Sequence, residues 1–97
     1  MTNYLKINPA DNVAVAIVTL AKGTKVTIDG IEITLQDEIG AGHKFALKDL
    51  AAKENVIKYG YPIGHAKTDL KQGALVNDSN VKTNLERIHS EIGMDVE

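Results

Sequence analysis

Glycine spacing is the sequence feature that most limits the fold of this chain. From residue 40 onward glycine recurs at positions 40, 42, 60, 64 and 73, so the intervening segments are short. Internal glycines weaken helices, whereas short strands joined by tight corners use them. The segments 43–47, 56–59 and 74–76 are therefore predicted to be short strands. The spacing favours an all-β domain.

The first 35 residues predict further strands and one hairpin. Residues 4–7 alternate weakly and end at an Asn-Pro pair, which indicates a short strand closed by a turn. Residues 12–20 are apolar and rich in Val and Ile; a helix of two turns is the alternative, but β-branching favours a strand. Residues 26–28 and 31–35 flank Asp29-Gly30, which can supply both positive-φ positions of a type I′ turn. This β-hairpin is the clearest local signal.

A short pattern recurs three times, in which a leucine is followed six residues later by a valine. The copies span residues 20–26, 50–56 and 70–76. We interpret each as a buried leucine that anchors a turn and a valine that begins the next strand on the same core. The unequal spacings of 30 and 20 residues exclude a solenoid, which needs a fixed period. The pattern indicates repeated turn chemistry within one compact β domain.

One helix is predicted, at the C-terminal end of the chain. Thr83 and Glu86 match a capping box, an apolar stripe follows, and a glycine stands where a C′ cap would. We therefore expect a short helix over 84–92, and we divide the chain into a β domain at 1–82 and a helix and tail at 83–97. The narrow stripe fits docking on a partner and packing on the chain's own sheet equally well.

Composition excludes several classes of function. Ninety-seven residues with 43% hydrophobic and 25% charged side chains suit one small soluble domain. A net charge of −2 lacks the basic excess of nucleic-acid-binding proteins. Without cysteine the chain supplies no disulfide, thiol nucleophile or Cys-ligated metal. No signal peptide or apolar run of membrane-spanning length is present, so we expect a cytoplasmic protein with no membrane partner.

Three blocks of the sequence carry a resemblance to a known family. They are DNVAVA at 11–16, GHKFALKDL at 42–50 and VIKYGYPIGHA at 56–66. Together with the end of the domain they cover roughly residues 4–85. This pattern resembles the amino-terminal SAF domain of the altronate and galactarate dehydratase family. The resemblance implies a β-clip fold, an all-β arrangement of short bent hairpins, which agrees with the strands read above.

The same resemblance implies a hydro-lyase context, in which a metal-dependent enzyme removes water from a sugar acid to give a 2-keto-3-deoxy acid. Long family members carry this domain before a larger catalytic part, and split members carry it as a small subunit. The implied partner is thus a large catalytic dehydratase subunit that holds a divalent metal, iron or similar, while this chain alone binds no cofactor. A related split enzyme, sulfolactate sulfo-lyase, eliminates sulfite instead. The alternative is a non-catalytic module that binds an acidic sugar or caps another protein.

His43, Lys44 and Lys58 are the candidate substrate-binding residues, and the catalytic residues stay unknown. His43 and Lys44 follow a flexible Gly-Ala-Gly segment where side chains can meet an anion, and Lys58 can hold a carboxylate as a point charge. A turn histidine and a solvated lysine are the commoner roles of such residues, so the motif match is what favours function. The histidines at 43, 65 and 89 have no recognised metal-ligand spacing.

The remaining polar positions are given structural roles. Altronate-type members carry V-H-x-H-N where this chain has Val76-Asn77-Asp78-Ser79-Asn80, so both histidines are replaced, as in galactarate-type members. We interpret this segment as a polar turn first and a hydroxyl-binding loop second. Asp11 is expected to close a turn, Tyr59 to pack with its hydroxyl at an edge, and His65 and His89 to lie on the surface.

Overall fold

The computed structural model describes residues 2–83, and every regular element in that range is a β-strand. The strands are β1 (Tyr4–Leu5), β2 (Val13–Ala16), β3 (Lys25–Ile28), β4 (Ile31–Thr34), β5 (Lys44–Ala46), β6 (Asn55–Lys58), β7 (Tyr61–Ala66), β8 (Leu75–Val76) and β9 (Val81–Thr83). The expected all-β fold of short bent hairpins is confirmed. The helix predicted at 84–92 lies outside the described residues. Within 2–83 no helix is long and apolar enough to cross a membrane.

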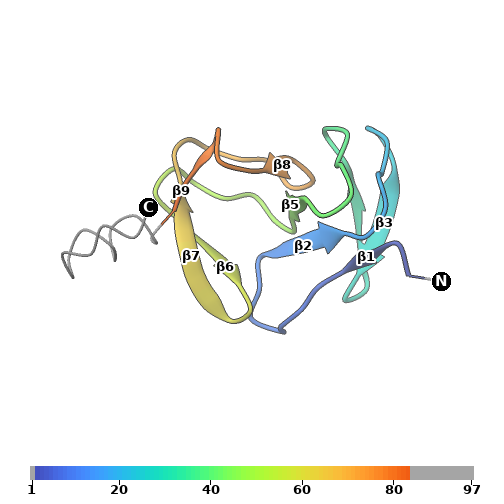
Figure 1. The fold of residues 1–97 in the computed structure, drawn as a ribbon, viewed down its shortest axis with the longest axis horizontal. Coiled ribbons are helices and arrows are strands. Elements are labelled where there is room, and N and C mark those ends of the chain that lie inside the picture. The colour runs from blue at the N-terminus through green and yellow to red at the C-terminus, as the bar shows by residue number, and fades with distance from the viewer. Residues whose placement is uncertain (1, 84–97) are drawn as a thin grey trace.

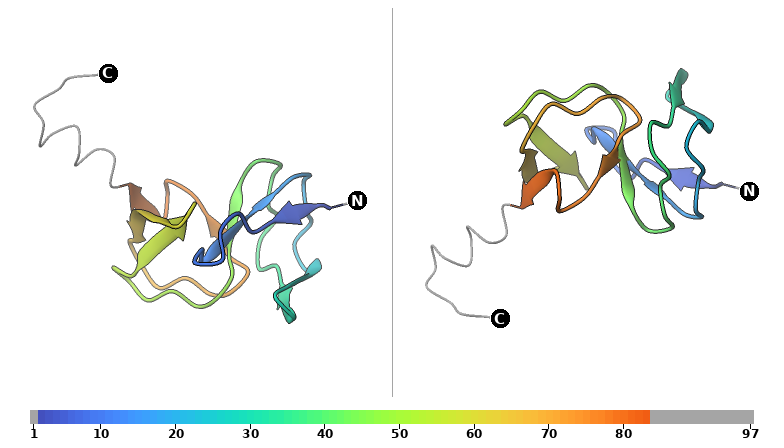
Figure 2. Two further views of the ribbon diagram at one scale, coloured as in Figure 1. Left: turned by 90° about the horizontal axis from the view of Figure 1, so that it is seen from below. Right: turned by 90° about the horizontal axis from the view of Figure 1, so that it is seen from above.

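The strands form three small antiparallel sheets (Figure 1). The central sheet has the order β1-β2-β5-β8, the ribbon β3-β4 lies to one side of it, and the sheet β6-β7-β9 lies to the other, as the two turned views in Figure 2 also show. The register of the central sheet places Lys44 opposite both Val15 and Val76. The first residue of β5 is thereby fixed in the middle of this sheet.

The central sheet divides the core into two clusters, because its side chains alternate between two faces. One face carries Ala14 and Phe45 toward the cluster shared with β3-β4, and the other carries Ala46 and Val76 toward the cluster shared with β6-β7. Each fully buried aliphatic or aromatic side chain contributes about 2 kcal/mol. The interpretation that each leucine shares a core with its valine is confirmed: Leu20 and Val26 lie in the first cluster, and Leu50, Val56, Leu70 and Val76 lie in the second.

The leucine turns share one hydrogen-bond pattern, and a fourth copy begins at Ile39. Leu20 exchanges two backbone hydrogen bonds of 2.8 Å with Ile39, and Leu50 exchanges two of 2.8 and 2.7 Å with Leu70. In every copy the fifth residue donates its amide to the carbonyl of the second: Thr24 to Ala21, His43 to Gly40, Glu54 to Ala51 and Ala74 to Lys71. The fourth copy was not recognised in the sequence, because Ile39 and Phe45 stand in place of the leucine and the valine.

The fourth residue of each turn has a positive φ, and Lys53 is the non-glycine among the four. Its φ is 75°, against 87° for Gly23, 84° for Gly42 and 88° for Gly73. We expect Lys53→Gly to raise the free energy of unfolding by about 1 kcal/mol in urea denaturation, because an L side chain is strained in this region. Lys22→Gly, in the first turn at an ordinary φ, should instead lower it by about 0.5 kcal/mol. Equal effects of the two substitutions would contradict this account.

The predicted end of the strand at 12–20 is wrong, and the predicted hairpin is right. β2 ends at Ala16 rather than at residue 20, because the chain bends after Ala16 and leads into the bridge between Leu20 and Ile39. Residues 17–19 are exposed. The Asp29-Gly30 hairpin is confirmed, with φ angles of 54° and 78°.

A second two-residue hairpin, between β6 and β7, escaped the sequence analysis. Tyr59 and Gly60 form it with φ angles of 58° and 77°. Tyr59 is therefore a turn residue, and its side chain is 55% exposed. The expectation that Tyr59 packs against the core is wrong, because the tight turn directs it outward.

Candidate functional site

Lys44 lies on the face of the central sheet that meets the second cluster. It is two residues from Ala46 along β5, so both side chains are on this face. Its cross-strand neighbours Val15 and Val76 are apolar, and Lys44 itself is half-buried. A lysine in this setting keeps its stem against apolar side chains while its ammonium group seeks solvent or an anion.

Lys58 lies close enough to Lys44 to change how it titrates. Burial lowers the pKa of Lys44, the positive charge of Lys58 lowers it further, and the carboxylate of Asp78 opposes both effects. Lys58 ends β6, which packs against β2, and its Nζ atom lies 4.8 Å from the centroid of the Tyr59 ring. The fold therefore brings together two lysines that are 14 residues apart in the sequence.

Within residues 2–83, Lys44 and Lys58 form no ion pair. The salt bridges within residues 2–83 join Lys6 to Asp29 and Lys48 to Glu54, and involve neither Lys44 nor Lys58. A small anion placed between the two ammonium groups would relieve their repulsion and replace water lost from the half-buried Lys44.

The turn at 77–80 lies beside this pair, since it follows Val76. The Asn77 Oδ1 atom accepts hydrogen bonds from the Ser79 amide at 3.0 Å and the Ser79 hydroxyl at 2.6 Å. Asn80 accepts from the Asn77 amide and donates to the Leu75 carbonyl, at 3.0 and 2.7 Å. These side chains hold the turn itself, which agrees with the polar-turn interpretation. Asp78 remains exposed next to Lys44.

The structure places His43 in the turn before β5. Its exposed ring lies beside Gly40, where a Cβ atom would be 3.3 Å from His43 Cδ2, and its carbonyl accepts from the Ala16 amide at 2.9 Å. Of the three predicted residues, Lys44 and Lys58 lie close enough for their charges to interact. His65 is half-buried on β7, and His89 lies outside the described residues. Within 2–83 no group of three or more His, Asp or Glu side chains is placed to hold a metal ion.

Asp11 and Asn12 are the buried polar residues that position β6. The Asp11 carboxylate accepts from the amide of Asn8 at 3.0 Å and from that of Gly60 at 2.8 Å. The Asn12 side chain accepts from the Ile57 amide at 2.8 Å and donates to the Asn55 carbonyl at 2.9 Å. The turn-closing role expected for Asp11 is confirmed. These contacts also clamp the end of β6 to the start of β2, which sets where Lys58 lies.

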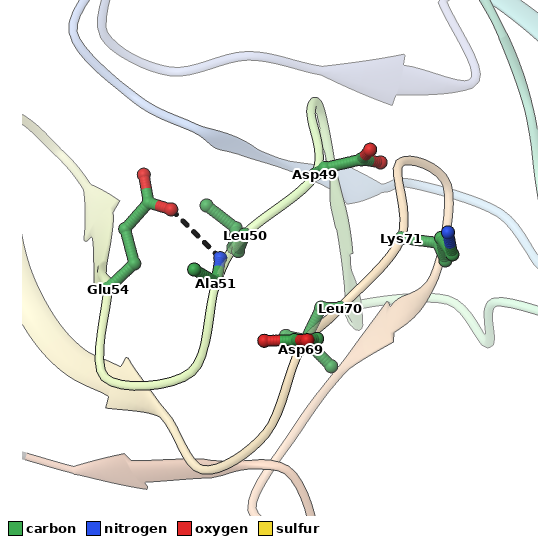
Figure 3. Close-up of a pocket in the computed structure, with 7 residues that line it drawn as sticks. All are labelled: Asp49, Leu50, Ala51, Glu54, Asp69, Leu70 and Lys71. Carbon is green, nitrogen blue, oxygen red and sulfur yellow. Dashed lines mark hydrogen bonds between the residues drawn. The ribbon is translucent and has the colours of Figure 1, made fainter.

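A cavity of about 350 Å³ opens where the turns at Leu50 and Leu70 meet (Figure 3). Two of its carboxylates hold the turns together. Asp49 accepts a hydrogen bond from the Gln72 amide, and Asp69 accepts one from the Ala52 amide, each at 2.8 Å. The Ala51 amide and Lys48 lower the pKa of the third carboxyl, that of Glu54. Sequence analysis missed this cavity, although an Asp-Leu pair precedes both turns. Three carboxylates make it unsuited to an anionic substrate.

Comparison with known proteins gives one family and several relatives. The family model described as the altronate/galactarate dehydratase SAF domain matches residues 2–84. Altronate dehydratase of Escherichia coli (strain K12) is 51% identical over 82 residues, which cover 84% of this chain and 17% of that protein. Altronate dehydratase of Bacillus subtilis (strain 168) is 39% identical over 88 residues, covering 91% and 18%. The (2R)-sulfolactate sulfo-lyase subunit alpha of Chromohalobacter salexigens is 43% identical over 53 residues, covering 55% and 56%. The chain thus spans less than a fifth of the two dehydratases.

Proposed function

The chain belongs to the altronate/galactarate dehydratase SAF domain family, and from this premise we propose that it is the small subunit or N-terminal domain of a sugar-acid dehydratase. In this proposal a large catalytic partner holds the divalent metal, iron or similar, and supplies the base. The observation that supports the proposal is the pair Lys44 and Lys58, which form no ion pair within residues 2–83, in a chain that is 51% identical to an altronate dehydratase over 82 residues.

The two lysines suit one step of such a reaction. Elimination of water from a sugar acid needs the carboxylate held while the proton on the adjacent carbon is removed, and the negative charge that develops must be stabilised. Lys44 and Lys58 would hold that carboxylate between two positive charges. His43, on the turn before Lys44, stays a prediction for the rim of the pocket.

A sulfo-lyase small subunit is the second candidate function. The observation that favours it is the 43% identity to the sulfo-lyase subunit alpha, a much shorter protein of which this chain covers 56%. The same lysine pair would then hold the carboxylate of sulfolactate, and sulfite would leave in place of water.

The test is an assay of the chain together with its large partner. The chain is purified with its partner from the source cells, and 2-keto acid is measured after addition of altronate, galactarate or (2R)-sulfolactate. We expect keto acid from a sugar acid, and loss of activity when a chelator removes the metal. A preparation from which this chain is omitted serves as the control. Sulfite release from sulfolactate would support the second candidate, and no keto acid from any of the three acids would contradict both.

A further inference from the structure

The face of the central sheet that carries Lys44 is covered at one end and open at the other. Val76, Lys44, Val15 and Leu5 form one row across strands β8, β5, β2 and β1. Along this row Val76 is fully buried, Lys44 and Val15 are half-buried, and Leu5 is 49% exposed. Burial therefore falls from β8 toward β1.

Ile17 extends the same open surface. Its amide donates to the Asn3 carbonyl, which continues the β1-β2 register by one step, so Ile17 shares a face with Val15. Its side chain is 48% exposed. Leu5, Val15 and Ile17 define what we call the open face.

The opposite side of β1 is covered by the β3-β4 ribbon, whereas the open face is exposed. Tyr4 packs against the first cluster, and its hydroxyl accepts from the Thr27 amide of β3 at 3.1 Å. The sheet β6-β7-β9 lies toward the far end of the central sheet from β1 (Figure 1) and covers Val13, Ala46 and Val76. A contiguous exposed aliphatic surface is typical of an interaction site.

We propose that the open face is where the catalytic part of the enzyme docks, and that docking completes the substrate site at Lys44 and Lys58. This inference rests on the proposed function. The occupant is the polypeptide that makes up the remainder of the relatives, of which this chain spans 17% and 18%. The groups that act on the carbon next to the carboxylate must lie close to the lysines that hold it. A partner seated on Leu5, Val15 and Ile17 reaches that position, because Lys44 borders the open face.

Photo-crosslinking of the assembled enzyme tests the docking. The photoreactive residue p-benzoylphenylalanine replaces Leu5, Ile17 or, as a matched control, Ile31, which is 54% exposed on the β3-β4 ribbon. Keto-acid formation is measured for each enzyme before irradiation, and cross-linked peptides are identified by mass spectrometry. We expect positions 5 and 17 to give about tenfold more cross-links to the catalytic part than position 31, because an interface buries its central side chains completely.

The outcomes separate this inference from the proposed function. An active enzyme with equal cross-linking at all three positions would overturn the docking face alone. So would cross-links from positions 5 and 17 that end in residues 84–97 or in a second copy of this chain. Absence of keto acid from every enzyme, the unmodified one included, would overturn the proposed function and the docking face with it.

Discussion

Replacing Gly73 by alanine should lower the free energy of unfolding by about 3 to 4 kcal/mol. Gly73 has a φ of 88°, and an added Cβ atom would collide with the Thr34 carbonyl oxygen and lie 3.2 Å from Leu35 Cα. Both are backbone atoms, which cannot swing aside as a side chain can. Gly73 also donates to the Ala46 carbonyl at 2.8 Å and accepts from the Gln36 amide at 2.9 Å, so a shift would break contacts between the two halves.

Gly23 provides the matched control for this substitution. It occupies the same position of the first turn with a φ of 87°, but nothing lies within 4 Å of an added Cβ atom. Gly23→Ala should therefore lower the free energy of unfolding by about 1 kcal/mol, the strain of the backbone alone. Urea denaturation of both variants measures the difference. Similar losses for the two would show that the contact with Thr34 is unimportant.

Replacing Lys44 by methionine should lower kcat/KM of the assembled enzyme about a hundredfold, since a charge-assisted hydrogen bond to the substrate is lost. The methionine keeps much of the apolar stem beside Val15 and Val76. Lys25→Met, which removes an exposed lysine on β3, is the control and should leave kcat/KM unchanged. If both variants retain full activity, Lys44 does not bind the substrate.

The same substitution should raise the stability of the folded chain. The pKa of Lys44 is lowered in the fold, mainly by burial and then by Lys58, so the unfolded chain binds more protons. This destabilisation is fully present below the lowered pKa and disappears as pH rises through it toward the ordinary value of 10.5. The stability advantage of Lys44→Met should therefore shrink as pH is raised in the alkaline range. Thermal unfolding at several pH values measures it.

Local chemistry explains which parts of the fold could be predicted. Asp29-Gly30 carries its turn type in its own residues, and the glycine spacing indicates short strands wherever they lie. The Tyr59-Gly60 turn could not be predicted in this way, because it depends on a contact between distant residues. The Asp11 carboxylate, 49 residues from Gly60, accepts a hydrogen bond from the Gly60 amide. β2 ends early for a similar reason, since the bridge between Leu20 and Ile39 is a tertiary contact.

The candidate site, too, could be predicted only in part from the sequence. The motif resemblance singled out Lys44 and Lys58 one at a time, but their proximity depends on the β2-β5 register and on the Asn12 contacts with β6. His43 belongs to the same motif, yet its ring lies beside Gly40. The sequence could name the residues that carry charge, but only the fold shows which of those charges interact.

The division of the core by the central sheet has a consequence for cooperativity. Phe45 and Ala46 are adjacent on β5, yet they belong to different clusters, so neither cluster can lose its packing without disturbing the strand they share. We infer that the two halves melt in a single transition rather than as separate units. Lys44 is the first residue of that strand. Substitutions in the first cluster, at Ile33 or Leu35 for instance, would thus alter the strand that carries Lys44 without contacting that lysine.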